Sequence, residues 1–278
     1  MTQDIDRIIN RWRLPRADAS ILDRIEDMVN PAILDGHFGQ SATLRLLGWQ
    51  YHLCGRRDTQ ELAEMAQIEA ADHVLDVCCF LGGPAAQLAT NYGCWVTGID
   101  INPDYVAAAG RIAELADLED SLYFRTADAS AMPFADNHFS VVWNQASLDD
   151  NPQWLQEFDR VLQPGGRLAL TFAIHRGNQR QNSPSWSLAD VRGIIETMGY
   201  TILHCDDISE RDRINGWMAL DAKLVDNEAF YARRLGQEWV DQAHKEFERE
   251  IEEMALGVWG NGRIVAAKPN LEGQDDTL

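Results

Sequence analysis

The sequence is poor in basic residues, in cysteine and in long apolar runs. Its 24 Lys and Arg stand against 44 Asp and Glu, which gives a formal net charge of −20. Nucleic-acid backbones and anionic lipid surfaces are bound by clustered Lys and Arg. The charge balance therefore argues against nucleic acid and membrane surfaces as partners, and the acidic surface is expected to serve solubility.

Five cysteines at irregular spacings give neither a disulfide framework nor a set of zinc ligands. No run of about 18 apolar residues is available for a membrane span. The first residues, M-T-Q-D-I-D-R-I-I-N-R-W-R, lack the apolar core of a signal peptide. These absences predict a cytoplasmic protein without a metal site. Hydrophobic residues, at 45% of the 278, suffice for the core of one large domain.

The stretch from His73 to Asp100 has the pattern of a strand, a glycine turn, a helix and a second strand. An apolar strand at 73–77 precedes the turn L-G-G-P, whose proline suits the first turn of a helix. A second apolar strand at 94–99 ends at Asp100. A glycine turn followed about 20 residues later by an acid is typical of nucleotide-type cofactor sites.

Strand and helix patterns continue to alternate as far as residue 205. Strands are expected at 73–77, 94–99, 122–126, 139–143, 167–174 and 201–205, with a seventh at 258–268. The intervening helices are expected to begin at Pro84, Asn102, Gln153 and Ser187. This alternation predicts an α/β fold with a doubly wound, mostly parallel seven-stranded sheet and helices on both faces. Ligands of such sheets bind at the carboxyl ends of the strands.

Helical segments are expected on both sides of this unit. Before it they fall at 2–13, 18–29, 41–53 and 58–66, and after it at 206–256. Apolar residues in the second region recur at helical spacing, at Val240, Ala243, Phe247, Ile251 and Met254. We expect these segments to cover the open edge of the sheet.

The expected organisation has five parts. They are an N-terminal helical cap (1–70), a cofactor-binding core (71–205), a helical insertion that forms an acceptor-side lid (206–257), the last strand (258–269) and a disordered tail (270–278). The sequence leaves both a monomer and a homo-oligomer open.

Four stretches resemble motifs of the class I S-adenosylmethionine (SAM)-dependent methyltransferases. They are V-L-D-V-C-C-F-L-G-G-P-A, V-T-G-I-D-I-N, T-A-D-A-S-A-M-P-F-A-D-N-H-F-S-V-V-W and V-L-Q-P-G-G-R-L. The ending G-V-W-G-N-G-R-I-V-A-A-K-P is similar to small-molecule methyltransferases of the sarcosine/dimethylglycine and phosphoethanolamine type. The resemblance implies SAM as the cofactor and a small amine or amino-acid derivative as the acceptor. Methylation of sulfur or oxygen, and a non-catalytic protein with this fold, stay open.

The resemblance places the methionine part of the cofactor along Asp76 and the turn after it. The family has glycine at three alternate positions of this turn, where this chain has Cys78, Phe80 and Gly82, with Cys79 between the first two. Phe80 is the largest departure, because glycine lets the backbone come close to a ligand. Three outcomes are open: the ring turns outward and the turn is reshaped, the cofactor sits differently, or binding is lost.

The resemblance implies that the adenosine part lies along the second and third strands. Asp100 would bind both ribose hydroxyls, since a carboxylate offers two acceptor oxygens. Ile101 would pack on the adenine face, with Asn102 close by. Asp128 would accept a hydrogen bond from the adenine amino group, beside the N–H of Ala129.

Asn144 and Gln145, at the end of the fourth strand, would face the methyl donor and the acceptor. Methyl transfer from a sulfonium requires alignment and the exclusion of water, so no catalytic triad is expected.

Four further residues are candidates for contact with the acceptor. An amine must lose a proton, for which His37 and His175 are available. Arg176 could bind an acceptor carboxylate, and the ring of Trp143 could contact a cation. An ordinary structural role is the alternative for each of the four.

Overall fold

The computed structural model describes residues 20–177 and 184–270. The helix expected at 2–13, the first residues of the one expected at 18–29, and the tail from 271 onward lie outside these ranges. The centre of the fold is a seven-stranded sheet of order β3-β2-β1-β4-β5-β7-β6. Its strands are β1 (His73–Val77), β2 (Trp95–Asp100), β3 (Leu122–Thr126), β4 (Phe139–Gln145), β5 (Leu162–His175), β6 (Thr201–Asp207) and β7 (Trp259–Ala267).

The sheet is mostly parallel, which confirms the predicted fold class. β1 pairs in parallel with β2 and β4, and the parallel ladder continues to β3 on one side and β5 on the other. β7 is the exception, since it runs antiparallel between β5 and β6. β1 is buried over four consecutive residues, as expected for a central strand covered on both faces.

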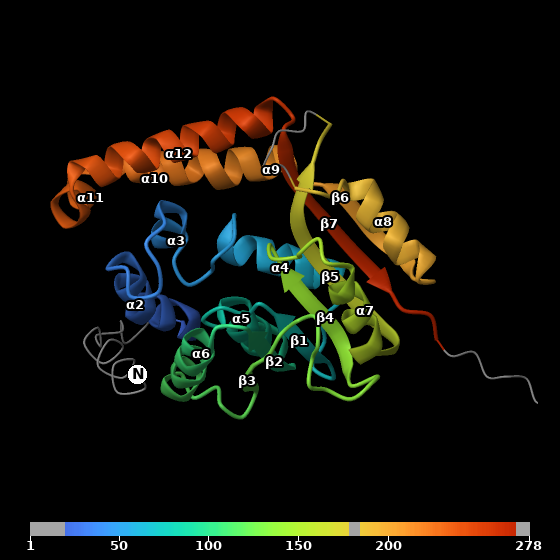
Figure 1. Ribbon diagram of the computed structural model, residues 1–278. Coiled ribbons are helices and arrows are strands. Elements are labelled where there is room, and N and C mark those ends of the chain that lie inside the picture. Colours follow the sequence, from blue (N-terminus) through green and yellow to red (C-terminus); the bar gives the residue numbers. More distant parts are fainter. Residues whose placement is uncertain (1–19, 178–183, 271–278) are drawn as a thin grey trace, which may run out of the picture.

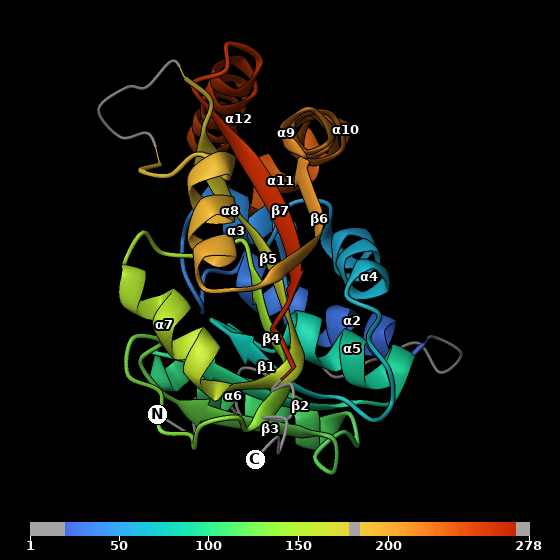
Figure 2. The ribbon, with the colours of Figure 1, turned by 90° about the vertical axis from the view of Figure 1, so that its right-hand side faces the viewer.

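Helices cover both faces of this sheet. Figure 2 shows α4 and α5 on one side and α7 and α8 on the other. The helices up to β6 are α2 (Ile21–Leu34), α3 (Ala42–Leu47), α4 (Gly55–Met65), α5 (Gly83–Tyr92), α6 (Pro103–Leu115), α7 (Pro152–Val161) and α8 (Leu188–Thr197). Ser41 and Ser187 cap α3 and α8, because their hydroxyl oxygens accept from N–H groups in the first turns of these helices.

The clearest differences from the sequence predictions are two boundaries and one connection. The helix expected at 41–53 ends at Leu47, because Gly48 takes a left-handed conformation with φ +73°. β5 begins at Leu162 and not at residue 167, since Leu162 already pairs with Phe139. The alternation is also not strict, because no helix lies between β3 and β4.

The insertion forms a helical layer beyond the carboxyl ends of the parallel strands. Figure 1 shows α10 and α12 running together above α3, and not along an edge of the sheet as the sequence suggested. Four of the five predicted apolar positions are buried, and they pack with Trp217 against Ala42 and Leu46 of α3. The layer contains α9 (Ser209–Asp212), a π-helix η1 (Arg213–Met218), α10 (Ala219–Asp226), α11 (Glu228–Leu235) and α12 (Gln237–Ala255).

Within the two described ranges, no helix combines the length and the apolarity that a membrane crossing requires.

Candidate functional site

The carboxyl ends of β1, β2 and β4 bring most of the predicted cofactor residues together. Asp76 of β1 lies beside Gly98 of β2 and Trp143 of β4 in the sheet register. The N–H of Cys79 donates to the Ile99 carbonyl at 2.9 Å and so continues the contact between the two strands. The turn then passes into α5, whose first residues are Gly83 and Pro84.

The turn keeps the left-handed backbone that glycine favours, although two of its three key positions are not glycine. The φ angles are +62° at Cys78, +50° at Phe80 and +75° at Gly82. Left-handed residues with a side chain cost roughly 1–2 kcal/mol each, and such strain concentrates at functional sites. The three outcomes set out from the sequence therefore stay open, with the backbone of the turn in the conformation that glycine would favour at these positions. The ring of Phe80 nevertheless turns away, to contact Tyr51 and Tyr105.

Asp100 is held in one orientation by two backbone donors. The N–H of Phe80 donates to Oδ2 at 3.1 Å, and the N–H of Asn102 donates to Oδ1 at 2.9 Å. Each carboxylate oxygen has a further lone pair. The fixed carboxylate can therefore accept a pair of hydroxyls, as predicted for a ribose.

The surroundings of Asp100 suit the adenosine part of the cofactor. Ile101 is 72% exposed and offers an apolar surface to a flat ring. Asn102 caps α6 by accepting from the N–H of Asp104. Asp128 is exposed, and hydrogen bonds from the N–H and hydroxyl of Ser130 hold the pKa of its carboxyl below the usual value. Ala129, beside it, is buried.

Two buried acceptor atoms, Asp76 Oδ2 and Asn144 Oδ1, have no hydrogen-bond donor among the described residues. Asp76 is 2% exposed, and its Oδ2 accepts no hydrogen bond from the described residues. Asn144 donates to the Val77 carbonyl at 3.0 Å, whereas its own Oδ1 has no such donor in the described ranges. Buried acceptors normally have a donor. The ammonium group of an amino-acid moiety, with three N–H donors, fits these two atoms.

Burial, together with the nearby Asp100 carboxylate, raises the pKa of Asp76 to about 8. The unfolded chain has an Asp pKa of about 3.9, so the folded protein binds the proton more tightly. The free energy of unfolding is therefore expected to fall as the pH rises from about 4 to about 8. In Asp76→Asn, thermal unfolding of the ligand-free protein between these pH values should lose most of this slope. If the stability of Asp76→Asn fell with pH as steeply as that of the wild type, the raised pKa would not belong to Asp76.

The side-chain amide of Gln145 is held by two residues of helix α4. Its Nε2 donates to Asp58 Oδ2 at 2.6 Å, and its Oε1 accepts from the Thr59 hydroxyl at 3.1 Å. Thr59 also lies 3.2 Å from Nε2 of the buried His52, whose pKa is lowered by its burial. Sequence reasoning noticed Asp58 and Thr59 only as the start of a helix and missed His52.

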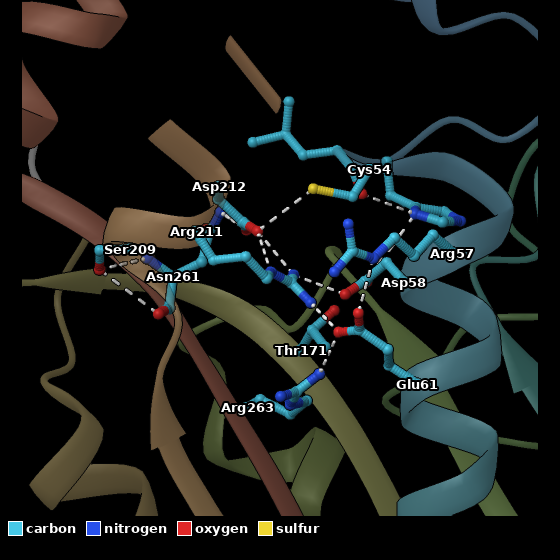
Figure 3. A network of polar contacts seen from close by, with 12 residues as sticks. Cys54, Arg57, Asp58, Glu61, Thr171, Ser209, Arg211, Asp212, Asn261 and Arg263 are labelled. Atoms are coloured by element: carbon cyan, nitrogen blue, oxygen red, sulfur yellow. Dashed lines mark hydrogen bonds and ion pairs between the residues drawn. The ribbon is translucent and has the colours of Figure 1, made fainter. Parts of the chain in front are cut away.

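A buried polar network extends from Asp58 to the insertion (Figure 3). Arg211 of α9 lies at its centre, with ion pairs to Asp58 at 2.5 Å, to Asp212 at 2.6 Å and to Glu61 at 2.9 Å. Arg263 of β7 reaches the same Glu61 at 3.3 Å. The network therefore joins α4, the insertion and the last strand next to the end of β4.

The other four candidates are not brought together. Trp143 is 0% exposed because it faces the same side of β4 as Val141, in the core. Arg176 donates to Asp207 at 3.0 Å, and His175 lies 3.8 Å from Asp190 of α8.

His37 is exposed in the turn after α2. Each of the four was a separate candidate for contact with the acceptor, and these placements agree with the structural alternative for Trp143. Among residues 20–177 and 184–270, no three His, Cys, Asp or Glu side chains are grouped to hold a metal ion.

Comparison with known proteins agrees with this geometry. A family model described as a methyltransferase domain matches residues 74–166. Methyltransferase GfsG of Streptomyces halstedii is 31% identical over 232 residues, which are 77% of this chain and 81% of that protein. The 27-O-demethylrifamycin SV methyltransferase of Amycolatopsis mediterranei is 43% identical over 117 residues, 41% of this chain and 43% of that protein.

The same fold occurs in phosphoethanolamine N-methyltransferase 2 of Haemonchus contortus in complex with SAM. The TM-score is 0.75 at 17% identity, over 92% of this chain and 62% of that chain. The motifs had predicted this assignment, and GfsG is similar along most of its length. The chain belongs to the class I SAM-dependent methyltransferases, and SAM is its cofactor.

Proposed function

We propose that this enzyme transfers the methyl group of SAM to a hydroxyl group of a small, uncharged organic molecule. One observation carries the proposal. Three arginine side chains in or beside the insertion already face carboxylates of the chain: Arg176 faces Asp207, Arg211 faces Asp58, and Arg263 faces Glu61. An acceptor carboxylate that bound one of these arginines would have to displace its partner, whereas an uncharged acceptor would not.

Oxygen as the methylated atom is supported by a relative. The name of the Amycolatopsis protein assigns its reaction to an oxygen of 27-O-demethylrifamycin SV. The amino-acid derivative favoured by the family resemblance carries a carboxylate, so it suits the paired charges less well. The net charge of −20 supports a small molecule over a nucleic acid as the acceptor.

The residues of this chain would bind and orient the reactants. SAM supplies a methyl group that its sulfonium has already activated. Asp100 would hold the ribose, while Asp76 and Asn144 would hold the amino-acid end. Residues 206–257 would act as a lid that excludes water.

Backbone strain at Ala146 marks the end of β4 next to this arrangement. Ala146 has φ +62°, and its N–H donates to the carbonyl and hydroxyl oxygens of Thr171, both at 2.9 Å. Because Thr171 lies beside Gln145 in the sheet register, the strained residue is held in place. Such strain supports a role of this turn in substrate binding.

A mass-spectrometric screen for methylated products would test the proposal. Uncharged alcohols and phenols should gain one methyl group with SAM present, and the same molecules with an added carboxylate should gain less. Amines, thiols and amino acids belong in the same panel. Methylation of amines or amino acids alone would contradict the proposal, and SAM binding without any product would favour a non-catalytic protein.

A further inference from the structure

The ring of Phe80 is enclosed although its backbone conformation disfavours any side chain. The residue is 8% exposed at φ +50°. Its ring centroid lies 5.4 Å from that of Tyr51 and 4.8 Å from that of Tyr105. A residue stays in such a conformation only where its surroundings hold it there, so these contacts must offset the strain.

Tyr51 belongs to a segment, Gly48–His52, that lies against the cofactor turn. The indole Nε1 of Trp49 donates to the Leu81 carbonyl at 2.8 Å, and Gln50 donates to Gln87 of α5 at 3.3 Å. The approach is close enough that a Cβ on Gly83 would lie 2.6 Å from the Trp49 carbonyl oxygen. The ring of Phe80 adds an apolar contact to these polar ones.

Tyr105 connects the same ring to α6 and to the loop before α3. Its hydroxyl donates to the Phe38 carbonyl at 3.0 Å, and the pKa of Tyr105 is raised by burial and by the neighbouring Asp100. Phe80 therefore lies where three segments meet: the cofactor turn, Gly48–His52 and the start of α6.

The backbone of Phe80 meanwhile contacts the carboxylate assigned to the ribose. Its N–H donates to Asp100 Oδ2 at 3.1 Å. The direction of this N–H depends on the left-handed conformation, and the buried ring holds that conformation. The ring and the carboxylate are thus linked through one peptide group.

We propose that Phe80 is a positioning residue for SAM: its ring, held between Tyr51 and Tyr105, fixes the N–H that orients Asp100. The inference rests on the assignment of Asp100 to the ribose. The proposal predicts an effect opposite to the one expected from the backbone conformation of residue 80 alone. Glycine would relieve the strain at position 80, yet it should weaken cofactor binding.

Calorimetry with SAM and with its demethylated product, S-adenosylhomocysteine, would test this on the full chain. Phe80→Gly is expected to weaken both at least about tenfold and to raise KM for SAM, with kcat near wild type at saturation. Tyr51→Ala leaves the residues of the turn unchanged but removes one of the two rings that hold Phe80, so it should weaken them in the same direction. Tyr123→Ala, which removes an exposed ring from the edge strand β3, should have no effect.

A double-mutant cycle with Asp100→Asn separates positioning from a general structural role. If Phe80 acts through Asp100, Phe80→Gly should cost about twofold or less in the Asp100→Asn background. A full tenfold loss in that background, or unchanged binding in Phe80→Gly alone, would overturn the inference. Wild-type protein that binds neither ligand would instead overturn the site assignment itself.

Discussion

Replacement of Asp100 by Ala is expected to weaken SAM binding at least tenfold, in a protein that still folds. Without the carboxylate, the complex would lose two hydrogen bonds to ribose hydroxyls. Hydrogen bonds to a charged acceptor contribute about 1.5–3 kcal/mol each. Tenfold corresponds to about 1.4 kcal/mol, so the loss of a single bond would suffice. The N–H groups of Phe80 and Asn102 would also lose their acceptor. Calorimetric titration with SAM gives the affinity directly.

Two further variants make the test of Asp100 specific. Asp120→Ala removes an exposed acid at the amino end of β3 and should leave the affinity unchanged. Asp100→Asn keeps the size and one acceptor oxygen, so it should fall between wild type and Asp100→Ala. If folded Asp100→Ala bound SAM as tightly as wild type, the ribose would not lie at Asp100.

The part of the site that could be predicted is local in sequence. The stretch from His73 to Asp100 forms the expected strand, turn, helix and strand. Buried apolar runs and glycine turns depend on a few neighbouring residues, so they can be recognised in the sequence. The acid follows its strand directly, so its position at the carboxyl end was also predictable. The conformation of Phe80 was not, since it depends on rings from two other segments.

Side chains with distant partners were beyond sequence reasoning. Arg176 was a candidate for binding an acceptor, and in the structure it donates to Asp207 at the end of β6. Trp143 was a candidate for contact with a cation, and the alternation of side chains along β4 places it in the core. Arg211 and Asp58 are far apart in the chain, so no local sequence pattern predicts that they form an ion pair.

Replacement of Arg211 by Met is expected to destabilise the protein by about 3–5 kcal/mol. It would leave Asp58 and Asp212 buried without their cation, and breaking one side of a buried ion pair has about this cost. Denaturant unfolding at neutral pH measures the loss. Arg213→Met is the matched control, because Arg213 pairs with the exposed Glu210, and an exposed pair contributes at most about 1 kcal/mol.

The pH dependence of the Arg211→Met defect distinguishes lost charge compensation from lost packing. Burial already raises the pKa of Asp212 while Arg211 opposes it, so removal of Arg211 should raise that pKa further. When the pKa of a carboxyl is higher in the folded than in the unfolded state, the free energy of unfolding falls as the pH rises from the lower pKa to the higher one. The defect of Arg211→Met should therefore be smallest near pH 4, about the unfolded Asp pKa, and should grow toward neutrality. A defect of equal size at every pH would mean that the side chain of Arg211 stabilises the insertion by packing, and that its charge contributes little.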